Sequence, residues 1–161
     1  MTYRAPAGTH VGHIHLKVSD LDRAVAFYCD VLGFDVRMRY GEQAAFLAVG
    51  EYHHHIGLNT WDSKNGYAPA KGSTGLYHVA FVYPNRRSLG QAVGHVIDNG
   101  VAITGAADHG VSEAVYFDDP DGNGIELYWD RDPSLWPKDA GGSLNLTNSP
   151  LDVAALVAEA S

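Results

Sequence analysis

The feature that most constrains this chain is an internal repeat with a period of about 65 residues. Two alternating segments, VGHIHLKV and GLYHVAFV, predict strands, and their histidines His13 and His78 stand 65 positions apart. Each segment is followed by apolar residues at helical spacing, and Gly33 and Gly100 close these two runs. Repetition on this scale indicates one supersecondary unit used twice.

Each repeat predicts a strand, a helix and three further strands. Ser19-Asp20 caps the first predicted helix, which runs to Leu32, and the second helix spans 85–99. Each unit alone would expose one apolar sheet face, so two units must pair to bury it. The predicted strands after the helices are 34–40, 44–49 and 54–60 in the first repeat and 101–104, 114–118 and 124–129 in the second.

We expect one domain over residues 1–161, made of two modules, a linker and a tail. Module 1 covers about 11–60, the linker 61–75, module 2 about 76–130 and the tail 131–161. The linker is rich in Gly, Pro, Asn and Ser, which is typical of a connector. In the tail, Ser149-Pro150 is expected to open a short helix, with the proline at its first position and Asp152 in its first turn.

Charge and composition exclude several classes of protein. The 161 residues include 19 acidic and 11 basic ones, a formal charge of −8, which argues against binding to nucleic acid or anionic lipid. A hydrophobic content of 45% argues against disorder. Cys29 is the single cysteine, and no apolar run reaches the roughly 20 residues of a membrane helix. Without a secretory signal at the N-terminus, we expect a cytoplasmic protein that acts on a small molecule.

Three residues form a candidate metal-binding set. His13 and His78 begin the two repeats, and Glu126 lies on the last strand of the second, after DPDGNG. Taken singly, such a histidine is usually a surface or core residue, and Glu126 could face solvent. Equivalent strands of paired units line one concave surface, however, so matching positions point into one cavity. Two imidazoles and one carboxylate are the ligand set that leaves open positions on iron(II).

The segments IHLKVSDLDRAVAFYCDVLGF, GLYHVAFVYP and YFDDPDGNGIELYWD resemble the vicinal oxygen chelate superfamily. This superfamily includes glyoxalase I, fosfomycin- and bleomycin-resistance proteins and type I extradiol dioxygenases. The resemblance covers about residues 11–130 and implies an α+β fold in which paired βαβββ modules form an incomplete barrel around a metal site. One fold hosts several chemistries, so the motifs alone do not fix the activity.

Within the superfamily the chain is most similar to the catechol 2,3-dioxygenase-like branch. That branch implies Fe(II), with Mn(II) as the alternative ion, held by His13, His78 and Glu126. It also implies a catechol-type aromatic diol and O2 as substrates, with extradiol ring cleavage as the reaction.

The same resemblance implies three catalytic residues. His54, in EYHHHIGLNTW, would act as general base and then acid. Tyr116, ten residues before Glu126, would donate a hydrogen bond to the bound diol oxygen. His109 would orient these groups, although it is displaced by about two residues from the usual position. His15, two residues after His13, is expected on the same face, and His53 and His55 at the rim.

Two alternative functions stay open. A glyoxalase-type lyase or isomerase uses a fourth protein ligand, at a position that falls on Ile56 here. A non-catalytic, antibiotic-sequestering protein of the bleomycin-resistance kind usually lacks the three ligands. The fosfomycin-resistance enzymes also have three ligands, but they bind a phosphonate with several cations, which suits this acidic chain less well. Many extradiol dioxygenases have four modules and this chain has two. We expect a homodimer, because such small units often associate through sheet edges or tails.

Overall fold

The computed structural model describes residues 2–160, and the chain forms two compact units, Met1–Tyr67 and Ala68–Ser161. The boundary falls in the segment expected to be a linker, and the single-domain organisation stays a prediction. Within residues 2–160, no helix combines the length and the apolar character needed to cross a bilayer.

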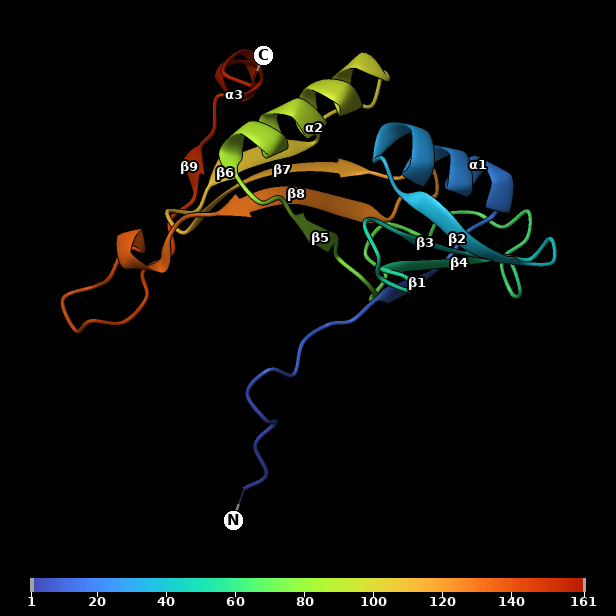
Figure 1. Cartoon of the computed structure of the whole chain (residues 1–161), viewed down its shortest axis with the longest axis horizontal. Coiled ribbons are helices and arrows are strands. Elements are labelled where there is room, and N and C mark those ends of the chain that lie inside the picture. Colours follow the sequence, from blue (N-terminus) through green and yellow to red (C-terminus); the bar gives the residue numbers. More distant parts are fainter. Residues whose placement is uncertain (1, 161) are drawn as a thin grey trace. The chain divides into compact units, whose positions relative to one another are not determined.

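The first unit is a four-stranded sheet covered on one face by a helix (Figure 1). The strand order is β1-β4-β3-β2, with β1 and β4 parallel and the other neighbours antiparallel. Its elements are β1 (Ile14–Lys17), α1 (Leu21–Ala26), a π-helical turn η1 (Phe27–Val31), β2 (Asp35–Tyr40), β3 (Ala44–Ala48) and β4 (Ile56–Asn59).

Local sequence explains where this first helix begins and ends. The Asp20 carboxylate accepts a hydrogen bond from the Arg23 N–H at 3.0 Å and caps α1. Gly33 has φ +74°, the left-handed conformation that closes the helical run. Between these ends, the chain widens into the π-helical turn η1. Tyr28, fully buried, belongs to the core between this run and the sheet.

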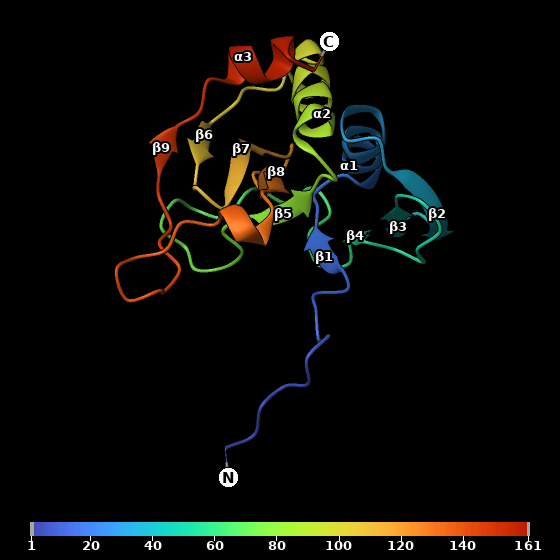
Figure 2. The same ribbon diagram turned by 60° about the vertical axis from the view of Figure 1, so that its left-hand side comes forward.

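The second unit is a five-stranded sheet with two helices (Figures 1 and 2). The strand order is β5-β8-β7-β6-β9, in which β5 and β8 are parallel. Its elements are β5 (Val79–Val82), α2 (Arg86–Asp98), β6 (Gly105–Asp108), β7 (Ser112–Asp118), β8 (Gly124–Asp130), a 3-10 turn η2 (Pro133–Leu135), β9 (Ser149–Pro150) and α3 (Val153–Ala158).

The long helix α2 forms as the sequence predicts. The Asn85 side chain accepts a hydrogen bond from the Ser88 N–H at 2.8 Å, and Gly100 has φ +76° just beyond the end. Leu89, Val93 and Val96 are fully buried. Ile97 is 43% exposed because it lies at the edge of the apolar stripe.

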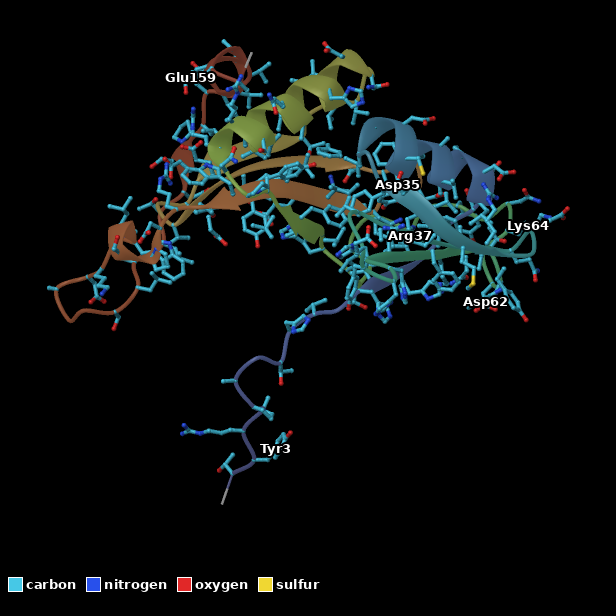
Figure 3. All side chains as sticks on the ribbon, in the orientation of Figure 1. Tyr3, Asp35, Arg37, Asp62, Lys64 and Glu159 are labelled. Carbon is cyan, nitrogen blue, oxygen red and sulfur yellow. The ribbon has the colours of Figure 1, made fainter. Side chains whose placement is uncertain are left out.

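The C-terminal helix α3 lies directly on α2 (Figure 2). A Cβ placed on Gly90 would lie 2.5 Å from the Leu156 carbonyl oxygen and 2.6 Å from the Ala160 Cβ, so only glycine permits this approach. Arg86, in the first turn of α2, forms ion pairs with Glu113 of β7 and with Glu159, just after α3. Figure 3 labels Glu159 at this end of the chain. Packing and charge together anchor the tail to the second unit.

The α+β class, the repeated βαβββ order, the open sheets and the short C-terminal helix are confirmed. Two local predictions are wrong. The strand expected at 101–104 lies instead at Gly105–Asp108, because these residues pair with β7. Ser149-Pro150 does not open a helix but forms β9 against β6, and α3 begins at Val153 with Asp152 as its cap. Proline is tolerated there because β9 is an edge strand.

Candidate functional site

The second unit brings His78 and Glu126 together. His78 immediately precedes β5, and Glu126 lies in β8, the strand that pairs with β5. The His78 Nε2 atom lies 3.0 Å from the Glu126 Oε2 atom, and the two side chains are 32% and 13% exposed. An imidazole nitrogen just before β5 and a carboxylate oxygen of β8 thus face each other.

A glycine of the DPDGNG segment makes this approach possible. A Cβ placed on Gly124 would lie 2.3 Å from the Tyr77 carbonyl oxygen and 3.2 Å from the His78 Cβ. Any other residue would therefore push the chain around His78 away from β8. A cavity of about 320 Å³ opens beside His78, with Gly124 and Tyr116 among its walls.

Tyr116 holds the second oxygen of Glu126. The two residues are partners in the antiparallel β7–β8 register, and the Tyr116 hydroxyl donates to Glu126 Oε1 at 3.1 Å. Burial, together with the nearby Glu126 carboxylate, raises the pKa of Tyr116 to about 12. The phenol is therefore protonated at neutral pH and serves as a hydrogen-bond donor.

His109 lies on the other side of the Tyr116 hydroxyl, although its sequence position departs from the usual pattern. Its Nε2 atom lies 2.8 Å from the Tyr116 hydroxyl, and its Nδ1 atom lies 3.0 Å from the Thr147 carbonyl oxygen. The second unit thus contains four of the six predicted site residues, and it adds Thr147, which the sequence did not indicate.

The first unit holds the other two predicted residues, His13 and His54. Their ring centroids are 4.4 Å apart, and the His54 ring also packs 5.2 Å from Phe46. Burial and the neighbouring imidazoles of His13 and His53 lower the pKa of His54. The His54 ring is therefore neutral at pH 7 and offers a lone pair to a proton.

The position of His54 differs from the expectation in one respect. Strand β4 begins at Ile56, so His54 lies in the turn before the strand and not on the strand itself. Because of this turn, the His53 Nδ1 atom lies 2.7 Å from the His54 Nδ1 atom, a contact that strict strand alternation would have excluded.

His15 packs on the same unit, above a glycine. A Cβ on Gly57 would lie 2.9 Å from the His15 ring, so the absence of a side chain there lets the imidazole lie over β4. The ring centroids of Phe46 and Trp61 lie 5.7 Å and 5.6 Å from that of His15. Burial and then His13 lower the pKa of His15.

The donors present suit a divalent metal. Imidazole nitrogen and carboxylate oxygen are ligands of iron and manganese, and Glu126 carries an anchoring phenol of the kind that orients metal ligands. Within residues 2–160, no three side chains of His, Cys, Asp or Glu gather into a complete metal site. The participation of His13 with His78 and Glu126 stays a prediction, because these residues belong to different units.

The chain is similar in sequence to known dioxygenases. The chain is 40% identical over 153 residues to catechol-2,3-dioxygenase of Bacillus subtilis, a match that covers 94% of this chain and 52% of that protein. It is 31% identical over 123 residues to biphenyl-2,3-diol 1,2-dioxygenase 3 of Rhodococcus globerulus, covering 75% of this chain and 63% of that one. The chain thus spans about half the length of the Bacillus protein.

Other relatives carry other chemistries on the same fold. They include metallothiol transferases and lactoylglutathione lyases, so the relatives are enzymes of more than one activity. A glyoxalase/dioxygenase from Nostoc punctiforme has a similar fold, with a TM-score of 0.65 at 23% identity, over 82% of this chain and 99% of that one. The sequence profile of one family matches residues 10–127, and membership of this family implies a divalent metal. The protein belongs to the Glyoxalase/Bleomycin resistance protein/Dioxygenase superfamily.

Proposed function

We propose that this protein is a metal-dependent type I extradiol dioxygenase that cleaves a catechol-type aromatic diol with O2. The observation that carries the proposal is the Tyr116 hydroxyl placed within hydrogen-bond distance of both His109 and Glu126, with Glu126 facing His78. A carboxylate held by a neutral phenol on one side and facing an imidazole on the other suits a metal ligand with a built-in positioning group. The 40% identity to a catechol-2,3-dioxygenase supports the same activity.

We propose that His13, His78 and Glu126 hold the ion, which is Fe(II) or, alternatively, Mn(II). When bound, such an ion would lower the pKa of a coordinated diol hydroxyl and offer open positions to the diol and O2. His13 would come from the first unit of the same chain or of a second copy. We also propose that the protein is a cytoplasmic homodimer. Sedimentation equilibrium tests its oligomeric state.

The protein's own residues would handle protons around the substrate. His54 is neutral at pH 7, because burial and neighbouring imidazoles lower its pKa, so it can accept the proton of a diol hydroxyl and return it later. Tyr116 lines the cavity beside His78, and its protonated hydroxyl can donate to a substrate oxygen. His109 would keep that hydroxyl oriented.

A glyoxalase-type reaction is less well supported by the same residues. Ile56, at the position of the fourth ligand of glyoxalase I, is fully buried and has no donor atom. The relatives named lactoylglutathione lyase nevertheless make the isomerase reaction the appropriate second assay.

The test is turnover by the full chain loaded anaerobically with Fe(II) or Mn(II). We expect oxygen-dependent formation of a yellow ring-fission product from catechol or biphenyl-2,3-diol. His54→Phe should slow turnover while the metal content stays at the wild-type value, and His95→Phe, on the exposed face of α2, should leave turnover unchanged. Conversion of the glutathione hemithioacetal without diol cleavage would refute the proposal in favour of a lyase. Absence of bound metal after gentle purification would favour a sequestering protein.

A further inference from the structure

We propose that the tail segment 137–150, here called the strap, positions the site, because the Thr147 carbonyl fixes the tautomer of the His109 ring. The catalytic consequence rests on the proposed function, whereas the tautomer does not. Two hydrogen bonds join Thr147 to His109: the Thr147 N–H donates to the His109 carbonyl at 3.0 Å, and the Thr147 carbonyl lies 3.0 Å from His109 Nδ1.

The strap is built to stay against the His109 loop. The Thr147 hydroxyl donates to the Asp108 carbonyl at 3.2 Å, and β9 continues the contact by pairing Ser149 with Asp108. Gly110 has φ +77°, and a Cβ there would lie 2.8 Å from Pro137 Cγ and 3.0 Å from Thr147 Oγ1. Only glycine therefore allows the strap to cross at this point.

Proton counting assigns the His109 tautomer. A carbonyl oxygen only accepts, so the ring atom that faces Thr147, Nδ1, carries the hydrogen. In the neutral imidazole the other nitrogen, Nε2, then has a lone pair and lies 2.8 Å from the Tyr116 hydroxyl, which can donate to it only when it does not donate to Glu126. Among residues 2–160, the Thr147 carbonyl is the hydrogen-bond partner of His109 Nδ1, so loss of the strap would remove the contact that selects this tautomer.

The tautomer determines what Tyr116 can do. Its hydroxyl has one hydrogen and two acceptors within reach, His109 Nε2 at 2.8 Å and Glu126 Oε1 at 3.1 Å. With the opposite tautomer, His109 would itself donate to the tyrosine oxygen and leave the hydroxyl hydrogen to Glu126 alone. The strap therefore gives Tyr116 a second acceptor, which lets its hydroxyl turn away from Glu126 without losing its hydrogen bond. In this sense Thr147 is a positioning residue that acts through His109.

The direct test is the protonation pattern of the imidazole in the metal-free full chain. With ¹⁵N-labelled histidine, long-range ¹H–¹⁵N correlation spectra distinguish the two tautomers, and His109→Gln identifies the His109 signals. We expect Nδ1–H for His109 in the wild type. An Nε2–H tautomer there would overturn the proposal, whatever the variants do.

Two substitutions of Thr147 distinguish an effect of the strap on the His109 tautomer from a general loss of stability. Thr147→Pro removes the N–H that donates to His109, and we expect a mixture of tautomers. Thr147→Val keeps both backbone bonds and removes only the hydroxyl bond to Asp108, and we expect the wild-type pattern. An unchanged tautomer in folded Thr147→Pro would refute the role of the strap. If that variant does not fold, Pro137→Ala, which loosens the crossing at Gly110, is judged by the same spectra.

Steady-state kinetics test whether the strap affects the proposed activity. In the metal-loaded protein, Thr147→Pro should lower kcat about tenfold with little change in KM, as is typical when a partner of an active-site group is lost. A tenfold rise in KM at unchanged kcat would contradict positioning of Tyr116. If no diol is cleaved at all, the dioxygenase proposal fails, and the tautomer of His109 is still decided by the spectra.

Discussion

The two units use the same order of elements, yet they end in different edges and carry different clusters. In the first sheet β2 is an edge strand with every residue exposed, whereas in the second sheet the corresponding strand β6 is covered by β9. In the first cluster the His54 ring packs against the rings of His13 and Phe46, and in the second the Tyr116 hydroxyl lies within hydrogen-bond distance of His109 and Glu126.

The two clusters favour different protonation behaviour in their central side chains, His54 and Tyr116. Burial and crowded imidazoles lower the pKa of His54, which favours a neutral base. Burial and an adjacent carboxylate raise the pKa of Tyr116, which favours a permanent donor that fixes an anion. A repeated supersecondary unit can therefore supply a neutral imidazole from one copy and an anchored carboxylate from the other.

The largest expected effect is on metal content, and it tests whether both units serve one ion. Because we propose that His13 and His78 bind the same ion, His78→Ala and His13→Ala should each abolish stoichiometric Fe(II) binding. His95→Ala, on the exposed face of α2, is the matched control and should retain it. Elemental analysis after anaerobic loading measures the result. Loss of metal in His78→Ala but not in His13→Ala would restrict the metal site to the second unit.

The next largest effect is on the free energy of unfolding, and it differs between the ion pairs of the two units. Glu113 of β7, only 8% exposed at its side chain, accepts from Arg86 and from Arg131, both at 2.7 Å. Glu113→Gln removes the charge between two cations and should lower the free energy of unfolding by about 3 kcal/mol. Asp22→Asn, in the exposed Asp22–Arg39 pair of the first unit, should change it by less than about 0.5 kcal/mol.

Urea unfolding followed by fluorescence gives both values. Equal destabilisation by the two substitutions would show that burial of the Glu113 network contributes nothing beyond an exposed pair.

A smaller effect tests how the tail is held on the second unit. Gly90→Ala would place a Cβ 2.5 Å from the Leu156 carbonyl, whereas Gly94→Ala meets only Val157 Cγ1 at 3.2 Å. We expect Gly90→Ala to destabilise α3, even though alanine gains about 1 kcal/mol of helix propensity over glycine. Gly94→Ala should be neutral or stabilising. Hydrogen exchange of the α3 amides measures this, and equal protection in both variants would contradict the close approach at Gly90.

The sequence predicts the repeated scaffold well because its signals are local. Asp20 and Asn85 are side-chain caps, and Gly33 and Gly100 adopt the left-handed conformation that ends helical runs. The strand expected at 101–104 fails for a non-local reason. Its β-branched residues favour a strand, yet the ladder with β7 is made by the less apolar residues Gly105–Asp108.

The same distinction between local and long-range signals applies to the candidate site. Asp118 and Gly124 are partners across the β7–β8 turn, so antiparallel pairing places Tyr116 opposite Glu126, and the spacing of ten residues carries this information. The contact between His109 and Thr147 joins positions 38 residues apart in a loop-rich tail, and no periodicity indicates it. The contact between His53 and His54 is local, but it depends on a turn that strand alternation does not indicate.

The smallest expected effect is a dependence of stability on pH that arises in the second unit. Hydrogen bonds from the Arg131 guanidinium, with help from the Gly110 N–H, hold the pKa of Asp108 below its ordinary value of 3.8. A carboxyl whose pKa is lower in the folded state stabilises the protein above its unfolded pKa. This stabilisation is lost as the pH falls through the folded pKa.

Urea midpoints measured from pH 6 downward should therefore fall below about pH 4, and Asp108→Asn should flatten that fall. The same substitution at Asp22 of the first unit is the control. Because Asp22 is 84% exposed in its ion pair, solvent screens it, and its loss should leave the acid limb nearly unchanged. A flatter fall in Asp22→Asn than in Asp108→Asn would reverse the assignment of acid sensitivity between the two units.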